Sequence, residues 1–213
     1  MNDKPNSTTG VHVSSANSLA VEDLGSAAQR DRRKRILDAT IALASQGGFD
    51  AVQMRGVAEQ ADVALGTLYR YFPSKIHLLV SALQREFERT ESIMRERPSD
   101  GDTVADRVIN TLKRTTRGMQ SDPQLTEALT RAFMFADASV AAEIHQVGML
   151  LTSMLTRAMY PEGHDKLTEE DVAIARVIGD VWLSALVGWV TGRSTAAETG
   201  QQIEVAVKLL LRD

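Results

Sequence analysis

The chain has 213 residues, of which 43% are hydrophobic and 24% are charged, and its formal net charge is −4. This balance is typical of a globular protein with one substantial core or two smaller ones. The absence of cysteine excludes disulfides, a thiolate nucleophile and a zinc–thiolate site, and the four histidines lie too far apart in the sequence to suggest a metal site. We therefore expect neither a metal nor another cofactor.

Residues 1–25 are rich in Ser, Asn, Thr and Gly and contain little that could be buried, which predicts a disordered tail. The tail lacks the basic start and apolar run of a signal peptide. The pattern Ser26-Ala-Ala-Gln29 is typical of a capping box, so we expect the first helix to begin there. We expect it to end at Gly47-Gly48, with Phe49 folding back onto the core.

The first helix carries most of the basic charge, in the run QRDRRKR. Residues 26–80 contain eight Lys or Arg and five Asp or Glu, a net charge of +3, although the whole chain is acidic. One basic end on an acidic protein predicts a local contact with a polyanion. A solvated helix face is the commoner origin of such a run when it is considered alone.

Two short helices are expected next, over residues 54–61 and 65–71. Ala58 and Ala61 are small where the helices must approach closely, and Asp62 occupies the turn, where a left-handed conformation is tolerated by Asp. This spacing predicts a helix-turn-helix, whose second helix enters the major groove of DNA. The alternative is plain globular packing, with the tyrosines of the second helix buried against the next one.

A long helix should follow from the cap Ser74 to about residue 97, with Lys75 at its first position. A positive charge there opposes the helix dipole. A phosphate group would offset that cost and would also accept hydrogen bonds from the free backbone N–H groups. Lys75 is therefore a candidate phosphate clamp, and Thr67, Tyr69 and Tyr71 are available for further contacts with DNA.

The helical pattern restarts after residue 101. We expect helices over about 102–119, from Pro123 through QLTEALTRAFMFA, and over about 138–159, 168–191 and 195–211. No strand signal is found. The predicted fold is all-α with about nine helices: a three-helix helix-turn-helix domain over residues 26–80 and a second helical domain over residues 81–213.

The most apolar segment, VIGDVWLSALVGWV, looks too short to span a bilayer and contains Asp180, so we expect a cytoplasmic protein without membrane contact. The last two helices offer the longest apolar surfaces and are expected to pair with those of a second copy. The pairing residues would be Val177, Val181, Ala185, Ile203, Val207 and Leu210.

Apolar side chains of the C-terminal half could line a cavity for a bulky apolar ligand. Methionine adapts to irregular shapes, which suits a rigid fused-ring ligand. Simple core packing explains any one of these residues equally well, and the two tryptophans could instead face a dimer interface. The candidates are Phe133, Met134, Met149, Leu150, Met154, Trp182, Leu186 and Trp189.

An enzyme is not indicated. The sequence contains no G-x-S-x-G, P-loop, dinucleotide-binding glycine pattern or H-E-x-x-H motif. Acidic pairs such as Glu169-Glu170 are explained as helix starts. A helical protein-interaction module without a role on DNA would leave the Tyr-Arg-Tyr-Lys cluster unexplained.

The segment ILDATIALASQGGFDAVQMRGVAEQADVALGTLYRYFPSKIHLLVSAL resembles the DNA-binding domain of the TetR family of bacterial repressors, and GTLYRYFPSK is its most specific part. The resemblance implies a helical homodimer that binds double-stranded DNA at a palindromic operator, and it implies that residues 81–213 form a C-terminal ligand-binding and dimerisation domain. Ala64 stands where many members have a capping serine. The candidate DNA-binding residues are Gln53, Arg55, Leu65, Thr67, Tyr69, Arg70, Tyr71 and Lys75.

Further segments, among them LTEALTRAFMFADAS and DVAIARVIGDVWLSALVGW, resemble one group within that family, the repressors of steroid (cholesterol) catabolism genes. This resemblance implies release from DNA by a small-molecule inducer, a steroid CoA thioester. Arg131, Arg157 and Arg176 are available for its phosphates. The alternative on the same scaffold is a repressor that responds to fatty acyl-CoA or to drug-like apolar ligands.

Overall fold

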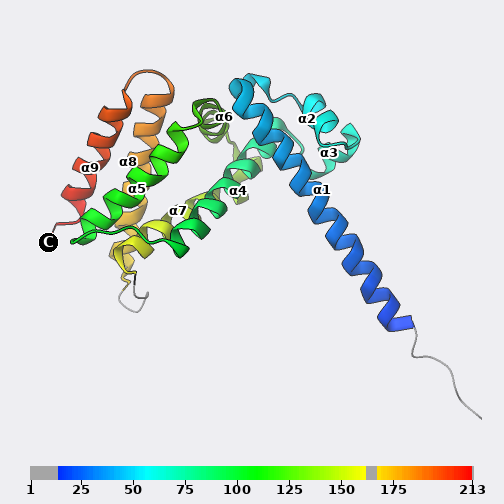
Figure 1. Ribbon diagram of the computed structural model, residues 1–213, viewed down its shortest axis with the longest axis horizontal. Coiled ribbons are helices and arrows are strands. Elements are labelled where there is room, and N and C mark those ends of the chain that lie inside the picture. The colour runs from blue at the N-terminus through cyan, green and yellow to red at the C-terminus, as the bar shows by residue number, and fades with distance from the viewer. Residues whose placement is uncertain (1–13, 162–166, 213) are drawn as a thin grey trace, which may run out of the picture.

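The computed structural model describes residues 14–161 and 167–212, and within these ranges every regular element is helical (Figure 1). This confirms the predicted all-α class. The elements are α1 (Ser14–Ala51), α2 (Met54–Gln60), α3 (Leu65–Tyr71), α4 (Lys75–Glu96), α5 (Val104–Gln120), α6 (Pro123–Met134), the 3-10 turn η1 (Ala138–Val140), α7 (Ala141–Met159), α8 (Glu169–Val190) and α9 (Ala196–Leu210).

The helices form an elongated molecule. Figure 1 shows α1, α2 and α3 at one end and α5, α8 and α9 at the other, with α4 running from the first group into the second. α6 packs against the end of α1, and α7 packs against both α4 and α8. We call the α1–α3 end the head.

The first helix begins earlier than the sequence predicted. α1 starts at Ser14, so Ser26 lies inside the helix and cannot be its N-cap. The expectation of a disordered tail is therefore wrong for residues 14–25, and residues 1–13 lie outside the described part of the chain. The physical reason is that SLAVED and the alanines after it contain good helix formers, which allow the helix to extend beyond a local capping pattern.

The chain bends at Gly47 and Gly48, as predicted. Both residues are non-helical, and Gly48 has φ of 66°, a left-handed value that favours glycine. A Cβ atom on Gly48 would lie 2.6 Å from Oε2 of Glu127 on α6. The bend turns Phe49 back against the buried core, which was also predicted.

The helix-turn-helix forms with the expected turn. Asp62 has φ of 52°, the left-handed conformation that its position predicted. The Nη1 group of Arg35 on α1 donates hydrogen bonds to the carbonyl oxygens of Ala61 (2.6 Å) and Asp62 (3.3 Å), and so holds the turn from outside. Val57 and Leu68 are fully buried and lock α2 and α3 together.

Most helix starts follow the predicted caps. The hydroxyls of Ser74 and Thr195 accept backbone N–H groups of α4 and α9, and Asp122 does the same before Pro123 on α6. α5, which was expected from about residue 102, begins at Val104 and is capped by Thr103. Its capping box with Asp106 satisfies the free N–H groups at the helix start.

The apolar segment VIGDVWLSALVGWV lies in α8, whose bounds agree with the helix predicted over residues 168–191. An 18-residue window of this 22-residue helix has a mean hydropathy of 1.5, which by length and composition alone is enough to cross a membrane, although the apolar segment itself looked too short. A core helix of a globular protein has the same composition. α8 packs against α7 and α9, and its buried Trp182 donates from Nε1 to the hydroxyl of Thr116 at 2.8 Å. These contacts are those of a core helix.

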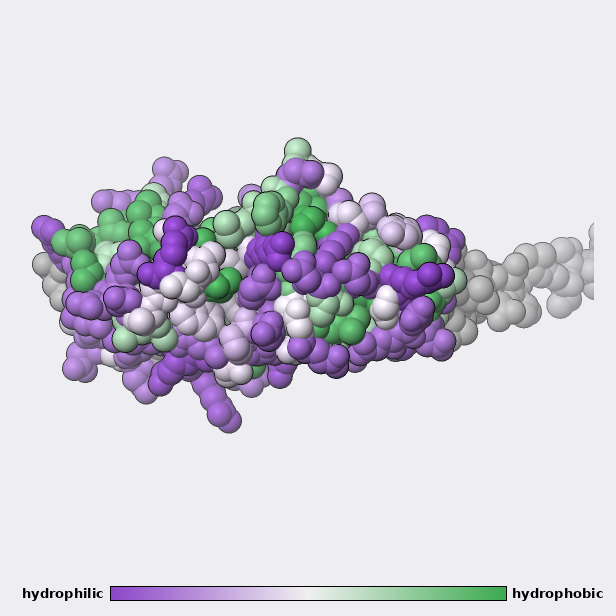
Figure 2. Space-filling model, turned by 90° about the horizontal axis from the view of Figure 1, so that it is seen from above, coloured by the Kyte–Doolittle hydropathy of each residue, from purple (hydrophilic) through white to green (hydrophobic). Residues whose placement is uncertain are grey.

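The apolar residues of α9 divide between two faces. Ile203 and Val207, together with Ala185 on α8, were expected to pair with a second copy, but all three are buried in the chain's own core, so this part of the prediction is wrong. Val205 and Leu209 point outward and are 51% and 56% exposed. Figure 2 shows apolar surface at the left end of the molecule, the end that Figure 1 assigns to α9.

Candidate DNA-binding surface and ligand cavity

The helix α3 has one buried and one exposed face. Leu68 is fully buried and anchors the helix in the head. Leu65, Tyr69 and Arg70 are exposed, with Tyr69 at 46%. Thr67 is half-buried, and its Oγ1 accepts a hydrogen bond from Nη2 of Arg70 at 3.1 Å. This outer face presents hydroxyl, aromatic and guanidinium groups to the solvent.

The starts of α2 and α3 lack side-chain caps. Ala64 precedes α3 without a capping hydrogen bond, as its side chain dictates. Gln53 precedes α2, and its Nε2 donates instead to the carbonyl oxygen of Asp50 at 2.8 Å. Arg55 is exposed, with its Nε 3.8 Å from Oε1 of Glu59. Gln53 and Arg55 are thus both at the surface near the start of α2.

The basic run of α1 meets the end of α3. Gln29 and Arg32 on α1 and Arg70 and Tyr71 on α3 line an open groove of about 360 Å³. Tyr71 is half-buried against the ring of Phe72, with the ring centroids 6.3 Å apart, so it belongs partly to the core. The groove brings two guanidinium groups from separate helices to one place.

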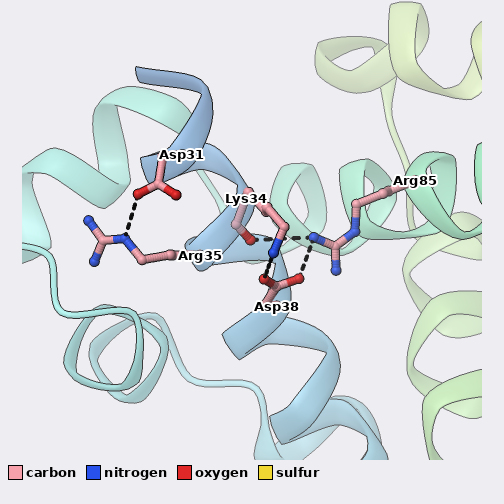
Figure 3. Close-up of polar contacts among 5 residues, drawn as sticks. All are labelled: Asp31, Lys34, Arg35, Asp38 and Arg85. Atoms are coloured by element: carbon pink, nitrogen blue, oxygen red, sulfur yellow. Dashed lines mark hydrogen bonds and ion pairs between the residues drawn. The ribbon is translucent and has the colours of Figure 1, made fainter. Parts of the chain in front are cut away.

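Other residues of the basic run have structural partners (Figure 3). Asp38 accepts hydrogen bonds from Nζ of Lys34 (2.9 Å) and from Nη1 of Arg85 on α4 (2.8 Å), and Arg35 pairs with Asp31 at 3.2 Å. Partial burial would raise the pKa of Asp38, but the hydrogen bonds and charges of Lys34 and Arg85 hold it below its usual value. The Arg85–Asp38 pair connects α4 to α1, and the other two pairs lie within α1, so part of the basic run serves the fold.

Lys75 has a partner inside the head. Its Nζ lies 3.9 Å from the centroid of the Phe49 ring, and Cζ of Arg131 on α6 lies 4.5 Å from the same centroid. Burial and the charge of Arg131 lower the pKa of Lys75, and the carboxylates of Asp50 and Glu127 oppose that shift. The aromatic face stabilises the lysine at the start of α4 without a phosphate.

The same aromatic ring marks the junction between the head and α6. The backbone N–H of Phe49 donates to Oε2 of Glu127 at 2.8 Å. Nη1 of Arg131 lies 3.3 Å from Asp50 and 3.6 Å from Glu127. Charged groups of α6 therefore hold the backbone and the ring of the segment that follows the Gly48 bend.

A cavity of about 140 Å³ lies beneath α6, α7 and α8 and reaches α4. Its wall is mostly apolar, and Phe87 meets Trp182 there edge to face, with their centroids 6.1 Å apart. Three of the sequence candidates are in this wall, namely Phe133, Trp182 and Leu186. Leu83 and Phe87 of α4 were not among the candidates, although their four-residue spacing on one helix face was a usable signal.

The remaining ligand candidates lie elsewhere. Met134 and Met149 are 54% and 48% exposed and are not in the cavity wall, so the structure does not place them at a ligand site. Leu150 and Trp189 are half-buried and pack against the core. Met154 is buried and lines a separate small cavity. Sequence spacing could not separate these positions, because it does not give the rotation of each helix.

A second cavity of about 410 Å³ adjoins the first and shares Leu83, Phe87 and Met119 with it. It lies between α4, α5 and α6 and is more polar, with Thr90, Thr115 and several charged groups in its wall. Across the described ranges no cluster of His, Cys, Asp and Glu could hold a metal ion. Together the two cavities could hold an organic molecule whose apolar part lies in the first cavity and whose more polar part lies in the second.

Comparison with known proteins gives the family. Residues 36–82 match the family described as bacterial regulatory proteins, tetR family, and residues 101–210 match the tetracyclin repressor-like C-terminal domain. The chain belongs to the TetR family. The two matched segments contain the helix-turn-helix and the helices α5 to α9.

This TetR-family chain is similar to the HTH-type transcriptional repressor KstR of Rhodococcus jostii (strain RHA1), with 59% identity over 198 residues, which cover 93% of this chain and 91% of that protein. A TetR transcriptional regulator from Rhodococcus sp. RHA1 shares its structure with a TM-score of 0.79 and 32% identity, covering 87% and 98% of the two chains. Thermus thermophilus FadR, solved with lauroyl-CoA, shares the fold with a TM-score of 0.65 and 18% identity, covering 84% and 93%. The likeness to the repressor KstR supports a role as a transcriptional repressor, and the likeness to FadR shows the shared fold alone.

Proposed function

We propose that this protein is a ligand-responsive repressor of steroid (cholesterol) catabolism genes. It binds palindromic operators in the cytoplasm as a homodimer and leaves them when a steroid CoA thioester occupies the C-terminal domain. The gene set and the inducer follow from the resemblance of the C-terminal helices to the steroid-responsive group. The structural support comes from a surface, a cavity and a connection between them.

The surface is the outer face of α3 with the basic groove beside it. Tyr69 and Arg70 are exposed there, and Arg32 of α1 lies at the groove that Arg70 lines. A helix-turn-helix places this face in the major groove, and its arginines next to the phosphates. Phosphate contacts supply most of the affinity, and base-edge contacts supply the sequence preference.

The cavities suit an elongated ligand with an apolar end. The first cavity alone, at about 140 Å³, is smaller than a typical site for a small molecule, but the adjoining cavity adds about 410 Å³. The fold also accommodates a CoA thioester in FadR of Thermus thermophilus, which was solved with lauroyl-CoA.

The main support for the proposal is that two helices, α4 and α6, extend from the cavity wall to the head. α4 has Leu83 and Phe87 in the cavity wall and Lys75 at its first position in the head, about 18 Å away along the helix from Phe87. α6 has Phe133 in the same wall and Arg131 at the Phe49 ring. A ligand that moves either helix therefore moves the head.

A two-part experiment tests this function. A mobility-shift assay on the DNA upstream of the protein's own gene should show a specific complex. A thermal-shift screen should then show the largest stabilisation with a steroid CoA thioester, compared with a fatty acyl-CoA and a free steroid, because binding to the folded state raises the melting temperature. A specific complex released by the fatty acyl-CoA alone would favour the acyl-CoA alternative, and the absence of any complex would reject the repressor.

A further inference from the structure

A third cavity, of about 70 Å³, lies between α4, α5 and α7 and differs from the other two in charge. Its wall contains the carboxylate of Glu91 and the guanidinium groups of Arg95, Arg114 and Arg157. These four groups give the cavity a net charge of +2. We call Arg95, Arg114 and Arg157 the arginine cluster.

The carboxylate of Glu91 is paired with two arginines of this cluster. Glu91 is only 8% exposed, and both of its oxygens accept from Nη2 of Arg95 at 2.8 Å. Nη2 of Arg157 lies 3.6 Å from Oε1 of Glu91. The carboxylate of Glu91 thus pairs with both Arg95 and Arg157, and among the residues that the structure describes no second carboxylate lines the cavity to pair with Arg114.

Arg114 has donor capacity that the described part of the chain does not use. Its Nη2 atom is buried and has no hydrogen-bond partner there, and the same holds for Nε of Arg157. Arginine has five N–H donors and no acceptor, and a buried donor without a partner destabilises the fold. Both arginines line the third cavity, so an anionic group there would supply the acceptors that these donors lack.

The three cavities follow one another through shared walls. The first and second share Leu83, Phe87 and Met119, and the second and third share Met94 and Arg114. The order runs from the apolar wall at Trp182 to the arginine cluster. The carboxylates of the second cavity already have partners: Glu86 lies 3.9 Å from Arg89, and Asp122 accepts from Ser45 and from the backbone of α6.

We propose that the arginine cluster, through Arg114 above all, binds an anionic group at the polar end of the effector, a phosphate or a carboxylate. The apolar ring system then occupies the first cavity, and the connecting chain crosses the second. This inference rests on the proposed function, because it requires an effector in the C-terminal domain.

The test compares Arg114→Gln with Arg117→Gln, an exposed arginine on the same helix that lines none of the three cavities. Three probes with one ring system are titrated calorimetrically: a steroid carboxylic acid, its CoA thioester and the neutral steroid ketone. Arg114→Gln should weaken binding of at least one of the two anionic probes by roughly 10- to 100-fold, the loss expected for a charged hydrogen bond. The affinity for the neutral ketone should not change. Arg117→Gln should change neither.

The probes also distinguish the source of the anion. If only the thioester depends on Arg114, the group bound is a phosphate; if the free acid depends on it as well, the site accepts a carboxylate. Equal losses for charged and neutral probes would overturn the proposal, since they indicate a structural role for Arg114. Unchanged affinities for all three would overturn it too.

Two controls keep the result interpretable. Should Arg114→Gln fail to fold, Arg114→Lys retains the charge and is expected to show a smaller loss that is again confined to the anionic probes. If the wild-type protein binds lauroyl-CoA and not the steroid probes, the proposed steroid function fails. Dependence of that binding on Arg114 would then still support the anion subsite, and independence would reject it.

Discussion

Phe49 is the residue on which the head and the C-terminal domain converge. Cations from α4 and α6 approach its ring, and a carboxylate of α6 accepts its backbone N–H. The sequence predicted that this residue folds back, because a Gly-Gly pair precedes an apolar residue. It could not predict the two cations, since Lys75 and Arg131 come from separate elements far apart in the chain.

The role of Lys75 can be tested by removing its charge. If its ammonium group reaches a DNA phosphate, Lys75→Ala should weaken operator and non-specific DNA alike and should make the salt dependence shallower by about one unit. The measurement is binding by fluorescence anisotropy at several salt concentrations. Lys208→Ala, at the far end of the molecule on α9, serves as the control. An unchanged slope with unchanged affinity would show that the lysine only packs on Phe49.

At the scale of helices, the ion pair between Asp38 on α1 and Arg85 on α4 predicts that the stability of the fold depends on pH. The pKa of Asp38 is lowered in the folded protein, so its stabilising contribution is present above the usual value of 3.8 and is lost as the pH falls through the lower folded value. The exposed setting limits this contribution to about 1 kcal/mol or less. The difference in unfolding free energy between wild type and Asp38→Asn should therefore be constant from about pH 7 to 5 and shrink below about pH 4.

Urea denaturation at each pH measures this difference. Asp31→Asn, which removes the exposed Arg35 pair on the same helix, is the matched control and should have a smaller effect. A difference for Asp38→Asn that stays the same at pH 3 would contradict the assignment to its carboxylate.

Helix boundaries could be predicted where the signal is local. Ser74, Asp122, Thr168 and Thr195 each accept a backbone N–H from the first turn of their helix, and one side chain is enough to place that helix start. The helix start predicted at Ser26 was wrong, because a capping pattern marks a start only where the preceding residues do not continue the helix.

The ligand cavity was less predictable than the helices. Phe133 lines it and the adjacent Met134 does not, although both are large and apolar. Neighbouring residues on a helix point about 100° apart, and the rotation of α6 is set by its contacts with α1, α4 and α8. Those contacts join distant segments, which a single sequence does not place.

At the scale of the whole molecule, the exposed apolar residues of α8 and α9 predict where a second copy binds. Leu209→Asp should convert a dimer to monomers and abolish operator binding, because a charge cannot be buried without a partner. Sedimentation at micromolar concentration measures the mass, and Gln202→Asp on the exposed surface of α9 is the control. Monomeric wild-type protein under these conditions would reject the dimer.

Coupling between cavity and head must act in both directions. A coupling free energy of roughly 1–3 kcal/mol would lower operator affinity about 5- to 150-fold, and saturating operator DNA must then weaken ligand binding by the same factor. We expect this for a steroid CoA thioester and not for free CoA, which lacks the ring system. Calorimetric titrations with and without operator test it, and equal ligand affinities in the two would exclude induction by that ligand.

The left-handed backbone at Gly48 has a genetic consequence. Any other residue there is strained by its φ of 66°, and its Cβ would crowd the Glu127 carboxylate that holds Phe49. A substitution at Gly48 should leave the outer face of α3 and the cavity unchanged while it weakens the contact between Phe49 and α6 that connects them. Among bacterial mutants whose target genes stay repressed in the presence of inducer, substitutions at codon 48 should therefore recur, although Gly48 belongs neither to the outer face of α3 nor to the cavity wall.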